Sequence, residues 1–206
     1  MPFFRRFRMI RVGRLMLVGM TALAASAIFV ATSRDVPGAP TITVGLIVKD
    51  LQVPFWLEMR KQAMEEAKAQ NVTLLFVAGR YAGDNTTQVN AIENMITRHV
   101  NAIAVAPSES AGIVPAIRKA EAAGIPVIAV DTATDPTDAV RSFIASDSYQ
   151  AGILEGKWAY AALKGKKPVI AMMHGQLGSQ VDTDRANGFL DGFGHQAKEN
   201  IVASVA

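Results

Sequence analysis

Apolar runs alternate with amphipathic segments along most of the chain. Four runs rich in Val, Ile and Ala have the composition of strands that are buried on both faces of a parallel sheet. They span residues 42–48, 72–78, 102–106 and 125–131. A segment with helical periodicity separates each run from the next, and this alternation predicts βαβ units. A fifth short strand is expected at residues 142–145.

The same alternation begins again after residue 146. The pattern predicts helix, strand, helix and strand at residues 149–163, 169–173, 181–196 and 201–205. We therefore predict an α/β fold, with a Rossmann-like N-terminal lobe over residues 41–146 and the start of a second lobe over residues 147–206. A terminal strand without a following partner leaves apolar surface unburied. The chain is thus expected to be the N-terminal portion of a longer protein, truncated at its C-terminus.

The first predicted helix, residues 54–70, carries two adjacent aromatic residues at its start. Its apolar positions recur every four residues and include Phe55 and Met59, which is typical of a buried helix face. Trp56 projects about 100° further round the helix than Phe55. One of the two rings is therefore expected to face the ligand cleft.

Two further helix starts are predicted from capping residues. Asn85 followed by Gln88 three positions later has the spacing of a capping box. Ser108 is expected to cap the helix that runs to residue 123.

The first 33 residues have the pattern of a secretory signal peptide. A segment with five arginines precedes an apolar run at residues 15–31, and small residues follow. A Pro/Gly linker is expected at residues 34–40. The alternative is a signal anchor that stays in the membrane. Either reading predicts a periplasmic protein that contacts the membrane only through this leader.

Charge and composition exclude several classes of protein. Six of the 21 basic residues lie in the first 34 positions, which contain no acidic residue, and the rest of the chain carries 15 basic and 18 acidic residues. This removes the main support for nucleic-acid binding. The chain has no cysteine, which excludes disulfides, thiol nucleophiles and cysteine zinc sites.

No catalytic or cofactor motif is present. The chain lacks a phosphate-binding glycine loop after a strand and lacks the G-x-S-x-G spacing of a nucleophile elbow. His99, His174 and His195 are not spaced as metal ligands. We therefore expect no enzyme activity, no metal and no cofactor, although His174 follows a strand and is a candidate for lining the cleft.

Polar and aromatic side chains at strand ends point instead to reversible binding. Asp131 ends the fourth strand, and ligands of open parallel sheets bind beyond the carboxyl ends of the strands. Arg185 offers a planar set of five donors. Together with an aromatic face from Phe55 or Trp56, these groups suit a neutral sugar. The alternatives are a loop-stabilising aspartate and a surface arginine.

Several collinear motifs resemble those of the ribose-binding-protein-like periplasmic sugar-binding proteins, which are related to the LacI-type repressors. They are Val-Pro-Phe-Trp at residues 53–56, the strand at 125–131, Ile-Ala-Ser-Asp with Ala-Gly at 144–152, Arg-Ala-Asn-Gly-Phe at 185–189, and the third strand at 101–107. The resemblance implies two Rossmann-like lobes joined by a hinge. It also implies a monosaccharide-type ligand that is delivered to an ABC transporter permease.

The resemblance also assigns roles to individual residues. Phe55 and Trp56 would stack on the sugar, and Asp131 and Arg185 would bond its hydroxyls. Ser146 would lie at the first crossing between the lobes. Gln176 replaces an apolar residue of the family and is expected to contact a hydroxyl.

Other readings stay open. Where the ribose binders carry Asn and Arg, this chain has Val53 and Thr132, so the identity of the sugar is not fixed. A membrane-anchored sensor domain, or a nonfunctional truncated fragment, would give the same pattern. A repressor's effector domain ranks last, because a leader stands in place of a DNA-reading helix-turn-helix.

Overall fold

A computed structural model of the chain describes residues 42–163, 166, 169–194 and 196–205. The predicted signal peptide and linker lie outside the described residues, as does His195. None of the helices in the described part of the chain combines the length and apolar character that crossing a bilayer requires.

Five parallel strands form the sheet of the first lobe. They are β1 (Thr43–Val48), β2 (Thr73–Ala78), β3 (Ala102–Val105), β4 (Val127–Val130) and β5 (Ser142–Ile144). Their spatial order is β2-β1-β3-β4-β5, and every neighbouring pair is parallel. The α/β fold with a parallel sheet is confirmed. All five carboxyl ends lie at one edge, which is where a parallel sheet places its ligand.

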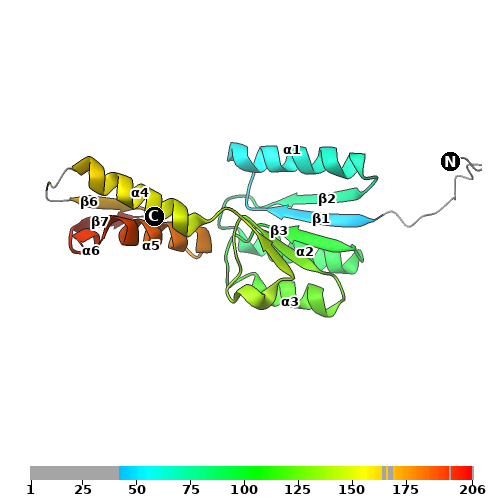
Figure 1. The fold of residues 1–206 in the computed structure, drawn as a ribbon. Coiled ribbons are helices and arrows are strands. Elements are labelled where there is room, and N and C mark those ends of the chain that lie inside the picture. Colours follow the sequence, from blue (N-terminus) through cyan, green and yellow to red (C-terminus); the bar gives the residue numbers. More distant parts are fainter. Residues whose placement is uncertain (1–41, 164–165, 167–168, 195, 206) are drawn as a thin grey trace, which may run out of the picture. The chain divides into compact units, whose positions relative to one another are not determined.

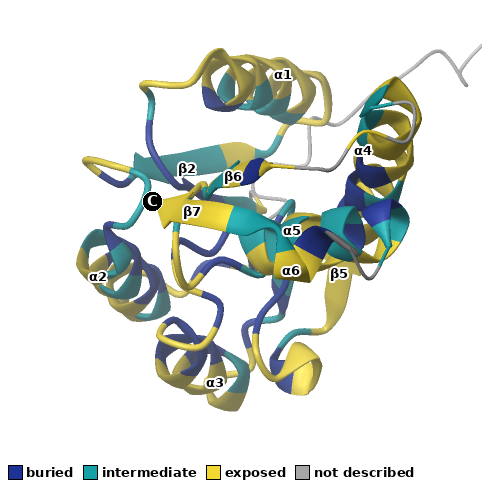
Figure 2. Ribbon diagram, turned by 90° about the vertical axis from the view of Figure 1, so that its left-hand side faces the viewer, coloured by how far each residue is buried: buried dark blue, intermediate teal, exposed yellow. Residues whose placement is uncertain are grey.

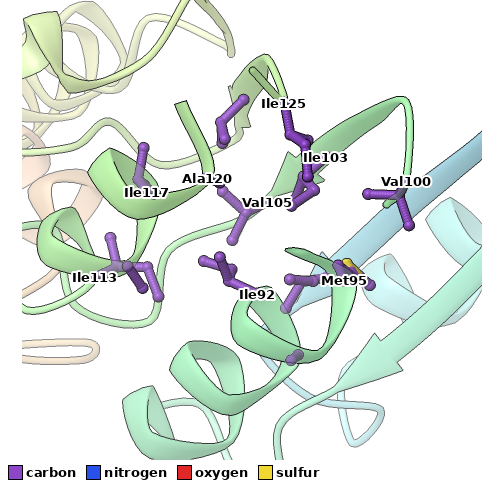
Figure 3. Packing of buried hydrophobic residues seen from close by; sticks show 13 residues of the cluster. Ile92, Met95, Val100, Ile103, Val105, Ile113, Ile117, Ala120 and Ile125 are labelled. Atoms are coloured by element: carbon purple, nitrogen blue, oxygen red, sulfur yellow. The ribbon is translucent and has the colours of Figure 1, made fainter. Parts of the chain in front are cut away.

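Helices cover both faces of this sheet (Figure 1). On one face lies α1 (Pro54–Ala69), and on the other lie α2 (Asn85–Thr97) and α3 (Val114–Ala122). The larger apolar cluster packs α2 and α3 on the sheet through Ile92, Ile103 and Ile117, all fully buried (Figure 3). A smaller cluster lies under α1. Burial on both faces explains why β1, β3 and β4 have continuous apolar sequences, whereas β2 is half-buried and β5 is exposed.

The buried face of α1 differs from the predicted one at its first turn. Trp56 is 6% exposed and packs against Leu46 and Val48 together with Met59. Phe55 is 53% exposed. The predicted stripe was therefore wrong at Phe55, where the larger indole of Trp56 covers the sheet instead, whereas Met59 and Ala63 of the stripe do pack against this cluster.

Both predicted caps were also wrong. The N-cap of α2 is Asp84, whose carboxylate accepts a hydrogen bond from the Thr87 N–H at 3.1 Å. Gln88 is buried and bonds the strand ends instead. Ser108 is buried too, but α3 begins only at Val114, with no side-chain cap.

The second lobe has its own small sheet. Two parallel strands, β6 (Ile170–Met173) and β7 (Ile201–Val205), pack with the helices α4 (Ser148–Leu163), α5 (Gln180–Phe193) and α6 (Gln196–Glu199). A short 3₁₀ segment, η1 (Thr137–Ala139), precedes β5 in the first lobe. β7 is largely exposed (Figure 2).

Glycines bring α4 and α5 into backbone contact. A Cβ on Gly152 would lie 2.3 Å from the Arg185 carbonyl oxygen, and one on Gly188 would lie 2.1 Å from the Tyr149 carbonyl oxygen. Gly156 and Gly192 make equally close approaches one turn further along. No other residue type fits there without moving a helix. This contact fixes the helix that carries Arg185.

Candidate functional site

Two charged side chains meet at the carboxyl edge of the first sheet. Lys49 directly follows β1, and Asp131 directly follows β4. The Lys49 Nζ lies 4.0 Å from Asp131 Oδ2, and Lys49 as a residue is only 7% exposed. Both residues come from strand ends that the parallel pairing holds in fixed register.

The backbone of Asp131 is held in an uncommon conformation. Its φ of 64° lies in the left-handed region, which non-glycine residues seldom adopt. Its N–H donates to the Ile144 carbonyl at 2.9 Å, and the hydroxyl of buried Thr132 donates to Asp131 Oδ2 at 2.7 Å. The carboxylate is thus fixed while its side chain stays 27% exposed. Such local strain is commonest at binding and catalytic sites.

Burial changes the ionisation of Lys49. Loss of hydration lowers the pKa of Lys49 below its ordinary value, and the nearby Arg185 guanidinium lowers it further. The carboxylates of Asp131 and Asp50 act in the opposite direction. A buried ammonium of this kind binds an oxygen acceptor more favourably than a solvated one.

Residues of the second lobe complete this cluster. Ser179, in the loop before α5, accepts a hydrogen bond from Lys49 Nζ at 3.2 Å. Lys49, Ser179 and Arg185 line one cavity of about 370 Å³ together with His174 and Gln176. A cavity of this size suits a small polar ligand.

Asp131 lines a second hollow and does not line the first cavity. The volume of this hollow is about 240 Å³, and Asp131 lines it together with Ser146 and Asp184. The Lys49 ammonium, which lines the first cavity, lies 4.0 Å from the Asp131 carboxylate, which lines the second.

His174 belongs to a separate hydrogen-bonded group at the end of β6. Its Nδ1 is 3.0 Å from Asp182 Oδ2, and its Nε2 is 2.9 Å from the Ser204 hydroxyl. Asp182, His174 and Ser204 thus contact one another in the order Asp–His–Ser of a hydrolase triad. However, the N–H groups of His174 and Gly175 already donate to Val205 and Asp182, so neither can stabilise an oxyanion. No group of three or more potential metal ligands occurs within the described residues.

The predicted residues are only partly brought together. Arg185 and Gln176 share one cavity, and Asp131 and Ser146 share the other. Phe55 is exposed and its ring meets Trp56 edge-on, with centroids 4.8 Å apart. Trp56 lies mostly in the core, so Phe55 is the ring that is exposed enough to contact a ligand. The stacking role of both residues stays a prediction.

Sequence reasoning missed Lys49 and Ser179. Lys49 follows its strand just as Asp131 follows another, so the argument from strand ends that selected Asp131 applied equally to it. Ser179 gave no comparable signal, because its contact with Lys49 joins residues 130 positions apart.

Comparison with known proteins identifies the family. Residues 44–206 match the family described as periplasmic binding protein domain. The ribose import binding protein RbsB of Bacillus subtilis (strain 168) is 29% identical over 147 residues, covering 71% of this chain and 47% of the relative. The galactofuranose-binding protein YtfQ of Escherichia coli (strain K12) is 27% identical over 184 residues, covering 88% of this chain and 57% of the relative.

A solved structure extends the similarity to the fold. An ABC transporter periplasmic solute binding protein from Actinobacillus succinogenes 130z, with bound D-allose, is 31% identical with a TM-score of 0.66. The match covers 80% of this chain and 59% of that one. The chain belongs to the periplasmic binding protein domain family. It spans about half the length of the curated relatives that it matches.

Proposed function

We propose that this chain is part of a periplasmic binding protein that captures a monosaccharide-type ligand and delivers it to an ABC transporter. The observation that carries the proposal is the convergence of Lys49, Asp131, Ser179 and Arg185 around the cavities at the sheet edge. The curated relatives named above are binding proteins for ribose and galactofuranose, which supports a sugar as the class of ligand.

The proposed contacts follow from the chemistry of each side chain. A sugar hydroxyl donates a hydrogen bond to the carboxylate of Asp131 and accepts one from Lys49 or Arg185. The exposed ring of Phe55 offers an apolar face for the C–H groups of a pyranose or furanose. Ser146, at the boundary of the lobes, adds a hydroxyl to the same wall as Asp131.

We propose binding without chemical change. A reaction needs a nucleophile or acid–base pair directed at the bound molecule. The Asp131 carboxylate is engaged by Thr132, and the Lys49 ammonium by Ser179. These groups orient a ligand through hydrogen bonds, and the ligand leaves as it entered.

Isothermal titration calorimetry with a panel of sugars tests the proposal. The panel comprises ribose, allose, galactofuranose, arabinose and myo-inositol, and we expect at least one to bind at micromolar concentration or below. NMR of the released ligand is expected to show an unchanged molecule. If no member of the panel binds, or if the bound sugar is released in altered form, the proposal is wrong.

A further inference from the structure

Two loops from different lobes meet beside the candidate site. One loop joins β3 to α3, and the other joins β6 to α5. The Ser110 N–H donates to the Gly178 carbonyl at 3.0 Å. In return, the Gln180 N–H donates to the Ser110 hydroxyl at 2.9 Å. The two hydrogen bonds clamp the loops together through a single serine.

A third hydrogen bond lies next to this pair. The side-chain amide of Gln176 donates to the Ser108 carbonyl. Ser108 and Ser110 are 0% and 4% exposed, whereas Gln176 and Gln180 are half-buried and Gly178 is exposed. We call the five residues Ser108, Ser110, Gln176, Gly178 and Gln180 the interlobe seam.

Hydrogen bonds within the first lobe hold Ser108 and Ser110 in place. The Ser108 N–H donates to the Gln88 side chain at 2.7 Å, and the Ser110 carbonyl accepts from the Asp135 N–H at 2.9 Å. Gln88 also donates to the carbonyl oxygens of Val48 and Ala106. The seam is therefore tied to the same strand ends that position Lys49.

The seam does not include the charged groups that face the ligand. Asp131 and Lys49 are in the first lobe, Arg185 is on α5, and none of them makes the three seam hydrogen bonds. Each seam bond exists only when the two loops are in contact. Opening of the lobes would break all three together and expose their groups to water.

We infer that the interlobe seam holds the lobes in the closed arrangement and so sets how slowly a bound sugar dissociates, without touching the sugar. The inference rests on the proposed function. The apparent affinity of a binding site falls with the fraction of molecules in the competent state. One hydrogen bond changes such an equilibrium about threefold to tenfold. The three bonds together shift it substantially toward closure.

This role differs from the one predicted for Gln176. A residue that contacts a hydroxyl changes the preference between sugars, because each sugar places its hydroxyls differently. A seam residue changes only the equilibrium between the open and the closed arrangement of the lobes. It therefore alters the dissociation rate of every sugar by the same factor and leaves the preference between two sugars unchanged.

The experiment measures closure and dissociation separately. The chain has no cysteine, so Lys68→Cys on α1 and Lys198→Cys on α6, both exposed, introduce two unique positions for spin labels. Pulsed electron paramagnetic resonance then reports the distance between lobes without added sugar. Stopped-flow fluorescence measures the dissociation rates of two sugars from the calorimetric panel.

Ser110→Ala and Gln176→Ala are the test variants. Each is expected to move part of the distance distribution to longer values and to raise both dissociation rates about threefold to tenfold, with an unchanged ratio. Ser142→Ala and Gln62→Ala, at exposed positions outside the seam, are matched controls. They are expected to change neither quantity.

The outcomes separate the seam from the proposed function. If distances and dissociation rates are unchanged in both test variants, the seam has no role in closure. If Gln176→Ala changes the ratio between the two sugars, Gln176 contacts the ligand and the inference is wrong for it. If no sugar binds but Ser110→Ala still lengthens the interlobe distance, the seam stands and the proposed function fails.

Discussion

The two lobes hold their candidate ligand groups by different means. In the first lobe, Lys49 and Asp131 are placed by strand ends within a sheet that is buried on both faces. In the second, Arg185 is placed by α5, which is fixed against α4 through glycines. One half of the site therefore depends on sheet packing and the other on the close approach of two helix backbones.

The lobes also differ in how much apolar surface they bury. The core of the second lobe has Ile170, Phe193 and Ala197 as its buried residues. On α4, Leu154 is 67% exposed and Trp158 is 72% exposed. Local stability follows buried apolar contact, so we expect the second lobe to open before the first.

The largest effect is expected from Gln88→Leu in the first lobe. This change removes three buried hydrogen bonds, to Val48, Ala106 and Ser108. We expect the free energy of unfolding to fall by about 3 kcal/mol, since each unsatisfied buried group costs on the order of 1 kcal/mol or more. Urea denaturation measures this. Asn90→Leu, at an exposed position of the same helix, is the control, and equal stability of the two variants would contradict the account.

A smaller effect is expected from Gly188→Ala in the second lobe. The added Cβ would lie 2.1 Å from the Tyr149 carbonyl oxygen, so the helices must separate, at a cost of about 2 kcal/mol. Hydrogen exchange is expected to quicken in α4 and α5 and to stay unchanged in β1 and β3.

Gly175→Ala is the matched control for this prediction. Its Cβ would find its nearest neighbour, Asp182 Oδ1, at 3.6 Å, which is ordinary contact. If Gly188→Ala exchanges no faster than Gly175→Ala in the two helices, the glycine contact does not hold the second lobe together.

Lys49→Met should change the free energy of unfolding least, and it should raise this free energy rather than lower it. Because burial lowers the pKa of Lys49, the unfolded chain binds more protons than the folded one between the folded pKa and the ordinary value near 10.5. The free energy of unfolding of the wild type therefore rises as the pH rises from the folded pKa toward 10.5. Below the folded pKa, Lys49 is charged and buried, and the wild type bears the full cost of that burial. We expect Lys49→Met to be more stable by about 1 kcal/mol at pH 7.

Thermal unfolding from pH 7 to pH 10.5 checks this prediction. The advantage of the variant should shrink as the pH rises, and its affinity for sugar should fall at every pH. Lys61→Met, which removes an exposed lysine of α1, is the control. A variant advantage that grows with pH would show that burial of the charge is not what destabilises the wild type.

Much of the fold follows from the sequence alone. The apolar runs predicted β1 to β4, and for β1, β3 and β4 the reason is that buried strand residues leave a continuous apolar pattern. The fifth strand was expected as well, although β5 is exposed at all three residues. Which aromatic residue of α1 is buried could not be predicted, since Phe55 and Trp56 are adjacent and only their contacts with the sheet decide between them. The caps failed because Gln88 and Ser108 are used in long-range contacts.

The candidate site was predictable to the extent that it lies at strand ends. Asp131 was found in this way, and the same rule would have given Lys49. Ser179 and the backbone groups of Gly178 and Gln180 act through contacts with residues far away in the sequence. No local pattern encodes such pairs, so the interlobe seam required the structure.

The most direct test of the central claim is the affinity of Asp131→Ala for the sugar that the wild-type chain binds. Calorimetry is expected to show a loss of about 10-fold to 100-fold, because a charged acceptor fixed beside Lys49 is removed. Asp138→Ala, which removes an exposed carboxylate from η1, is expected to bind like the wild type. An affinity of Asp131→Ala equal to that of Asp138→Ala would contradict the account.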